Sequence, residues 1–168
     1  MEAMKNLLER RSIRKYTDTQ VPDELLDKVL EAGLYAPTAK NNQKPVMVAV
    51  RDKETRDLLS KINAEIMDVE TDPFYGAPCV IVVLADPDMP TWIDDGSLVL
   101  GNMMNAAHAL GLGSCWINRA RQTFDRPEGK ALLEKWGLPE RYRGVGNCIL
   151  GYADEEPAPK ERLKGRII

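Results

Sequence analysis

The chain has 168 residues, of which 43% are hydrophobic and 29% charged, a composition typical of a folded globular protein and not of a disordered one. Its formal net charge of -3 argues against a surface that binds nucleic acid over most of its area. We therefore expect a single domain over residues 1–168, without a nucleic-acid partner, in which any basic cluster has a local purpose.

The hydrophobic segments argue against a membrane protein. The N-terminus lacks the apolar core of a secretory signal, and the segments 79–85 and 97–112 are too short or too interrupted to span a bilayer. We expect a cytoplasmic protein without membrane contact. Cys79, Cys115 and Cys148 lie far apart in apolar runs, so the sequence predicts three buried small side chains and no metal site.

Hydrophobic periodicity predicts the elements. Apolar residues three and four apart indicate helices, and short aliphatic runs indicate buried strands. Pro22 suits the first position of a helix, and Pro37 ends that helical pattern. In chain order we expect helices over 4–10 and 22–36, a polar loop over 38–44, a strand over 46–50, a helix over 54–67, a strand over 80–84, a helix over 95–110, a strand over 114–117, a helix over 128–136, a strand over 147–151 and an extended tail from residue 154.

This order predicts an α+β or α/β sandwich around a sheet of four or five strands. The helix over 95–110 is apolar nearly all round, so it must be covered on every side, and we expect a subunit interface to supply part of that cover. Asp94 and Asp95 are interpreted as capping groups of this helix. His108, the only histidine, is interpreted as a packed or interface residue and not as a catalytic base.

Two basic clusters stand near opposite ends of the chain. Residues 10–15 read RRSIRK, and Lys160 and Arg162 project to one side if the tail is extended. A phosphate dianion needs several charge-assisted donors, and the two clusters together can supply them. Taken alone, each cluster is more typical of a solvated surface. No fingerprint of a nucleotide-binding loop competes for this role.

The segment 36–45 reads APTAKNNQKP and concentrates carboxamides in a loop. Asn and Gln side chains offer both donors and acceptors, so they suit a ring with mixed polar edges or a chain of hydroxyls. An ordinary Asn-rich turn after a helix explains the same residues, and from this segment alone that explanation is favoured.

Taken in order, the motifs resemble the nitroreductase superfamily of flavoproteins over essentially the whole chain. They are R-R-S-x-R, A-P-(S/T)-x-x-N-x-Q, N-x-x-x-A-A-H-A-L-G-L-G-x-C-W-I, G-Y-A and K-x-R. The resemblance implies an α+β fold: a nitroreductase-like α-β-α sandwich with a mostly antiparallel sheet of four to five strands. It also implies a homodimer with FMN at the interface, in which the tail over 155–168 packs on the partner subunit.

The resemblance also implies the cofactor-binding residues. The N-terminal run and the tail would bind the phosphate and ribityl chain, the carboxamide loop would line the ribityl chain and the isoalloxazine edge, and the end of a late strand would lie against the ring. No side chain is expected to be catalytic, because flavin N5 carries the chemistry. The residues implied are Arg10, Arg11, Ser12, Arg14, Pro37, Thr38, Ala39, Asn41, Gln43, Trp116, Ile117, Asn118, Lys160 and Arg162.

The activity implied is two-electron transfer from NADH or NADPH through FMN to a nitroaromatic, a quinone or a similar acceptor by a ping-pong mechanism. Alternatives are other chemistry on the same fold, such as enone reduction or dehalogenation, and FMN binding without turnover. Two segments depart from the pattern: Lys44-Pro45-Val46 replaces the usual Pro-Trp, and the segment 63–76 has no signature. Within the latter, Phe74 and Tyr75 are candidates for a substrate-side wall or for ordinary packing.

Overall fold

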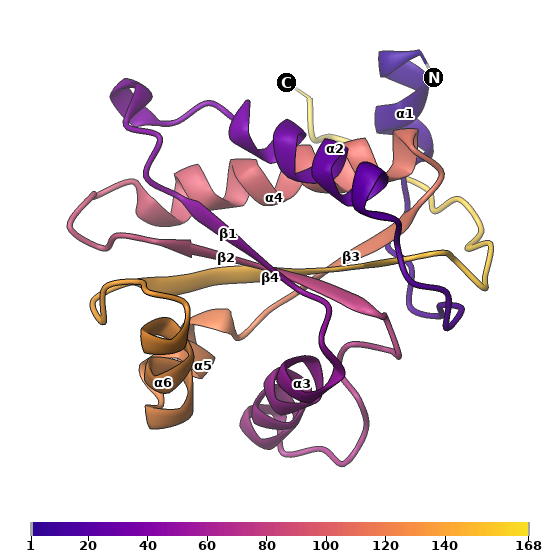
Figure 1. Cartoon of the computed structure of the whole chain (residues 1–168). Helices are drawn as coiled ribbons and strands as arrows, with labels where there is room; N and C mark the ends of the chain where they lie inside the picture. Colours follow the sequence, from indigo (N-terminus) through magenta and orange to yellow (C-terminus); the bar gives the residue numbers. More distant parts are fainter. Residues whose placement is uncertain (1, 168) are drawn as a thin grey trace.

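The computed structural model describes residues 2–167 and shows a sheet covered by helices on both faces (Figure 1). Helices α1, α2 and α4 lie above the sheet, and α3, α5 and α6 lie below it (Figure 1). The predicted α+β sandwich is therefore confirmed. The elements are α1 (Ala3–Glu9), α2 (Asp23–Leu34), the 3-10 turn η1 (Ala39–Asn41), β1 (Val46–Val50), α3 (Lys53–Met67), β2 (Cys79–Ala85), α4 (Trp92–Ala109), β3 (Gly113–Ile117), α5 (Ala120–Asp125), α6 (Pro127–Lys135) and β4 (Arg143–Gly151).

Within residues 2–167, four strands form one antiparallel sheet in the order β1-β2-β4-β3. Strand β2 is buried along its whole length, as its continuous aliphatic run predicts. Strand β3 lies at the edge, and its first part is extended by the N-terminal segment, since Ser12 and Ser114 form a parallel bridge. The remainder of this edge matters for the candidate site.

The alternation of side chains along β2 builds two hydrophobic cores. Cys79, Ile81 and Val83 face α2 and α4, whereas the residues between them face α3, α5 and α6. All three cysteines of the chain are free and buried, as predicted, and burial raises the pKa of Cys79 to about 12. They serve as small apolar side chains.

The predicted strands and long helices are all present, with ends shifted by a few residues. Helix α5 was missed because six residues are too few to show a helical period. Strand β4 begins at Arg143, earlier than predicted, because glycines interrupt its aliphatic run. One of them, Gly144, has a structural reason: a Cβ there would lie 2.4 Å from the backbone of Ala120, so glycine lets α5 approach the strand.

Helix α4 is covered on only part of its surface within the chain. Leu100 and Met103 are fully buried, but Leu98 is 47% exposed. Neither the sheet nor α2 covers this face within the single chain, so the cover expected from a subunit interface stays a prediction. In the described part of the chain, no helix is both long enough and apolar enough to cross a membrane.

Candidate functional site

The carboxamide loop is fixed to the first turn of α4 by one buried aspartate. Asp95 is 3% exposed, and its carboxylate accepts hydrogen bonds from the Ala39 N–H (2.9 Å) and from Asn42 Nδ2 (2.6 Å). Thr91 Oγ1 donates a third bond of 3.1 Å to the same carboxylate. Burial alone would raise the pKa of Asp95, but these three donors outweigh burial and hold the pKa below its usual range. The loop is therefore held by the ionised carboxylate of Asp95, which accepts three hydrogen bonds.

This anchor corrects the capping prediction. The N-cap of α4 is Thr91, and it makes no side-chain capping bond. Asp94 and Asp95 both lie inside the first turn, where negative charge favours the helix dipole. Asp94 is exposed, whereas Asp95 turns inward to the loop. Two aspartates at the start of a helix are typical of local capping, so the sequence pattern did not indicate the contact of Asp95 with the distant loop.

The loop displays its carboxamides in an unusual backbone conformation. Lys40, Asn41 and Gln43 have φ values of 52°, 54° and 51°, in the left-handed region that non-glycine residues seldom adopt. The Gln43 N–H donates to Thr38 Oγ1 at 3.0 Å, and Gln43 Nε2 donates to Asn41 Oδ1 at 3.0 Å. Asn41 and Gln43 remain exposed, as does Pro37. Strain of this kind persists only where surrounding contacts impose it, and it is common at ligand-binding loops.

The basic run lies beside the start of β3, at the other end of α4. The Ile13 N–H donates to the Ser114 carbonyl at 3.0 Å, and Asn6 Nδ2 of α1 donates to the Asn105 carbonyl of α4 at 2.9 Å. Because side chains alternate along an extended segment, Arg10, Ser12 and Arg14 share one side of the run. The other side carries the buried Ile13.

Two guanidinium nitrogens of the run are buried without a hydrogen-bond partner among residues 2–167: Arg10 Nη1 and Arg11 Nε. Arg11 Nη1 is engaged, since it donates to the carbonyls of Leu8 (2.8 Å) and Arg10 (2.9 Å). An unsatisfied buried cation is costly, so such atoms are candidates for binding an anion. The run is therefore more than a solvated surface patch.

The tail turns back along the run and brings acidic groups to it. Lys15 pairs with Asp154 at 2.6 Å, and the Arg14 N–H donates to the Glu155 carboxylate. Beyond this point the tail is exposed, and Lys160 and Arg162 lie in that exposed part. The structure thus joins the start of the tail to the basic run through Lys15 and Arg14.

His108 lines a cavity of about 640 Å³ between the basic run, the start of β3 and the tail. It is half-buried, and its Nε2 has no partner among residues 2–167. Burial, and then the charge of Arg10, lower the pKa of His108. It stays neutral at neutral pH, which agrees with a packed residue. Arg11 shares this cavity with Glu9, Glu155 and Glu156, so acidic groups offset its charge.

The open edge of β3 borders a second cavity, of about 180 Å³. Because the Ser114 carbonyl points outward to Ile13, Trp116, two residues further on, directs its backbone groups to the same open edge. Ile117 is buried, and Asn118 is exposed where the strand ends. Arg14 of the basic run lines this cavity as well. Four of the predicted residues thus meet here: Arg14, Trp116, Ile117 and Asn118.

Met67 at the end of α3, and Pro73 and Tyr75 in the loop between α3 and β2, form the other wall of this cavity. Tyr75 is 42% exposed, whereas Phe74 is fully buried in the core below the sheet. Of the two aromatic candidates for a wall, Phe74 is thus a packing residue and Tyr75 is available to a ligand.

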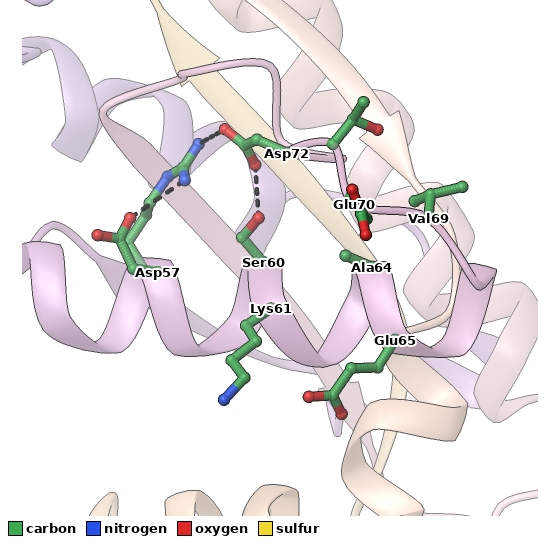
Figure 2. A pocket seen from close by; sticks show the side chains of 10 residues that line it. Asp57, Ser60, Lys61, Ala64, Glu65, Val69, Glu70 and Asp72 are labelled. Atoms are coloured by element: carbon green, nitrogen blue, oxygen red, sulfur yellow. Dashed lines mark hydrogen bonds and ion pairs between the residues drawn. The ribbon is translucent and has the colours of Figure 1, made fainter.

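Asp72 shapes this loop (Figure 2). Its carboxylate accepts hydrogen bonds from the N–H groups of Phe74 (2.8 Å) and Gly76 (2.7 Å), from Arg56 Nη2 (2.5 Å) and from Ser60 Oγ (2.5 Å). Figure 2 shows Asp72 turned toward Ser60 across a hollow between the loop and α3. Burial alone would raise the pKa of Asp72, but these donors lower it overall. No sequence pattern predicted this network, because its members are polar residues dispersed along the chain.

Replacing Asp72 with asparagine is expected to lower the free energy of unfolding at pH 7 by about 2 kcal/mol, because the amide nitrogen cannot accept two of the four hydrogen bonds and the other two lose their charge assistance. The pKa of Asp72 is depressed by folding, so its contribution is present above the unfolded pKa and is lost as the pH falls through the folded pKa. Urea titrations at pH 7 and at acidic pH measure this. The difference between wild type and Asp72→Asn should shrink in acid, and a constant difference would contradict a charge-based role.

The carboxamide loop and the basic run are far apart within one chain. The loop is anchored to α4 at Asp95, and α1, which leads into the run, is anchored at Asn105, ten residues and about 15 Å further along the helix (Figure 1). The predicted residues of the loop and of the run therefore fall into two groups, which we call half-sites. One consists of the exposed loop at the start of α4, and the other of the basic run and the open edge of β3.

Comparison with known proteins identifies the family of the chain. The sequence matches the model of the nitroreductase family over residues 7–152. A provisionally named NADH dehydrogenase/NAD(P)H nitroreductase of Archaeoglobus fulgidus is 36% identical over 161 residues, which cover 92% of this chain and 87% of the relative. An FMN reductase (NAD(P)H) of Bacillus subtilis is 29% identical over 179 residues, covering 96% of this chain and 70% of the relative.

The fold agrees with that assignment. A solved nitroreductase with bound FMN from Bacteroides fragilis superposes with a TM-score of 0.89 at 31% sequence identity, covering 100% of this chain and 97% of that one. With a family model matched over most of its length and a relative 36% identical across 92% of it, the chain belongs to the nitroreductase family of enzymes.

Proposed function

We propose that this chain is an FMN-dependent oxidoreductase that passes two electrons from NADH or NADPH to a nitroaromatic, a quinone or a similar acceptor. The observation that carries the proposal is the pair of buried, unpartnered guanidinium nitrogens of Arg10 and Arg11 beside the start of β3, in the run that leads to its open edge. An anionic phosphate satisfies such donors. The FMN bound in the Bacteroides fragilis nitroreductase supports the choice of cofactor.

The residues of the two half-sites fit the parts of FMN. Arg10, Ser12 and Arg14 on one side of the run would bind the phosphate and the nearby hydroxyls, with Arg11 beside them. The backbone of Trp116 at the open edge of β3 offers a donor and an acceptor to a polar ring edge. FMN supplies the two-electron redox chemistry when bound, and the protein orients it and excludes competing reactions. The remaining proposed contacts are Pro37, Thr38, Ala39, Asn41, Gln43, Ile117, Asn118, Lys160 and Arg162.

We propose that two copies of the chain complete each site. The half-sites lie toward the two ends of α4, and this separation favours a site in which each half-site meets its counterpart from a second subunit. Apolar side chains stand uncovered on α1, where Leu7 and Leu8 are 55% and 64% exposed. Leu98 of α4 and Leu163 of the tail are exposed as well. A homodimer in which the tail packs on its partner would bury such surface.

We propose a ping-pong mechanism, in which the nicotinamide donor leaves before the acceptor binds beside FMN. Steady-state rates at several fixed donor concentrations should then give parallel double-reciprocal lines. Intersecting lines would indicate that both substrates bind together.

The test of the proposed function is the visible spectrum of the purified protein under anaerobic conditions. We expect a flavin spectrum, FMN after denaturation, and bleaching by NADH or NADPH that a quinone reverses. A chromophore that neither nucleotide bleaches would indicate a non-turnover FMN-binding protein. Colourless protein that fails to bind added FMN would refute the proposal.

Sedimentation at micromolar concentration should show a dimer, and a monomer would contradict the shared site.

A further inference from the structure

Arg119 stands directly after the β3 edge and lines the same cavity as Arg14 and Tyr75. Its φ of 73° lies in the left-handed region, which is unusual for a long side chain and costs about 1 kcal/mol or more. The residue is half-buried. A strained backbone at the rim of a cavity points to a role for the side chain that it presents there.

A buried amide on α3 holds this arginine. Asn63 is 0% exposed, and its Oδ1 accepts a hydrogen bond of 3.1 Å from Arg119 Nε. Its Nδ2 donates to the Asn118 carbonyl at 2.8 Å. Both ends of the amide are therefore engaged, and together they fix the strand-end backbone and the direction of the guanidinium group. Asn63 is a positioning residue for Arg119.

The charge of Arg119 is not neutralised within the described part of the chain. Neighbouring arginines have carboxylate partners: Arg126 pairs with Glu65 at 2.9 Å, and Arg143 pairs with Asp125. Among residues 2–167, the side chain of Arg119 hydrogen-bonds only to the neutral Asn63, through its Nε atom. Its terminal nitrogens are thus free to meet a ligand, and they can offer parallel bonds to a carboxylate.

The lining of the cavity gives the class of ligand. It contains the cations Arg14 and Arg119, the flat ring of Tyr75 and apolar groups such as Met67, with no carboxylate side chain. In the proposed function Arg14 faces FMN, which leaves Arg119 for the substrate. An aromatic ring with an anionic substituent matches both the flat wall and the free charge.

We propose that Arg119 is a specificity-determining residue that selects aromatic acceptors bearing a carboxylate. The proposal rests on the proposed function, because it assumes that acceptors enter this cavity beside FMN. The expected preference is for an anionic acceptor such as 4-nitrobenzoate over its neutral analogue 4-nitrobenzamide, which has the same ring and a similar shape.

The experiment compares holoenzyme of wild type, Arg119→Asn and Arg119→Lys. Asparagine tolerates the left-handed backbone, so this variant removes the charge and keeps the turn. We expect the KM for 4-nitrobenzoate and the Kd for the unreactive ligand benzoate to rise about tenfold in Arg119→Asn, with 4-nitrobenzamide and benzamide nearly unchanged. Arg119→Lys should keep more affinity for benzoate than Arg119→Asn. The Kd values come from titration of the flavin spectrum.

Arg121→Gln is the matched control, because it removes an exposed positive charge from α5, the short helix that Arg119 immediately precedes. It should leave both acceptors unchanged. If Arg119→Asn weakens the binding of anionic and neutral acceptors equally, or affects only reduction by NADPH, while FMN content and bleaching stay intact, the proposed role of Arg119 is overturned. Wild-type protein that does not bind FMN at all would instead refute the proposed function itself.

Discussion

Replacing Asp95 with alanine is expected to raise the Kd for FMN by about tenfold to hundredfold, because several hydrogen bonds that hold the carboxamide loop are lost together. The Ala39 N–H and Asn42 Nδ2 lose their acceptor, and only the bonds of Gln43 to Thr38 and Asn41 are then left to hold the left-handed backbone of the loop. Asn41 and Gln43 would then sample other conformations, and FMN binding would have to order them again.

Asp94→Ala is the matched control for this prediction. Asp94 is the neighbouring carboxylate in the same first turn, but it is exposed. Fluorescence titration of the apoprotein with FMN measures both variants, and thermal unfolding followed by circular dichroism checks that the sheet remains folded. Equal FMN affinity in Asp95→Ala and wild type would show that the loop does not contribute to binding. The depressed pKa of Asp95 keeps its carboxylate charged throughout the neutral range, so its contribution is lost only as the pH falls through that depressed value.

The fold was predictable because its signals are local and strong. The aliphatic run of β2 and the helical period of α3 determine the type and order of these elements, and the two faces of β2 require helices on both sides. The ends of elements were less predictable where packing decides them. Gly144 in β4 weakened the strand pattern, yet the close approach of Ala120 requires it.

The candidate site was predictable only as separate segments. The motifs indicated the basic run and the carboxamide loop, but each depends on an anchor distant in sequence. Asp95 reaches Ala39 across 56 residues, and Asn63 reaches Asn118 across 55. Asn63 left one signal: it is a polar residue next to Ile62 and four residues after Leu59, on the face of α3 that turns to the core. Such a residue indicates a buried hydrogen bond without revealing its partner.

The two half-sites also predict how a dimer of two different variants binds FMN. Arg10→Ala damages the half-site at the β3 edge, and Asp95→Ala damages the loop. If each FMN lies between the run of one subunit and the loop of the other, a dimer of the two variants has one site with both defects and one site with neither. Each variant alone should form a dimer that retains little FMN.

Co-expression of Arg10→Ala and Asp95→Ala with two different affinity tags, followed by tandem purification, isolates this mixed dimer. We expect about one FMN per mixed dimer, with NADH-driven quinone reduction restored to the same extent. If both half-sites of one FMN came from the same subunit, every site in the mixed dimer would carry one defect, and the dimer would be as empty as its parents. Failure of the two tags to co-purify would refute the dimer. Recovery of FMN in the mixed dimer therefore requires that each FMN is bound by the run of one subunit and the loop of the other. Neither single variant can give this result.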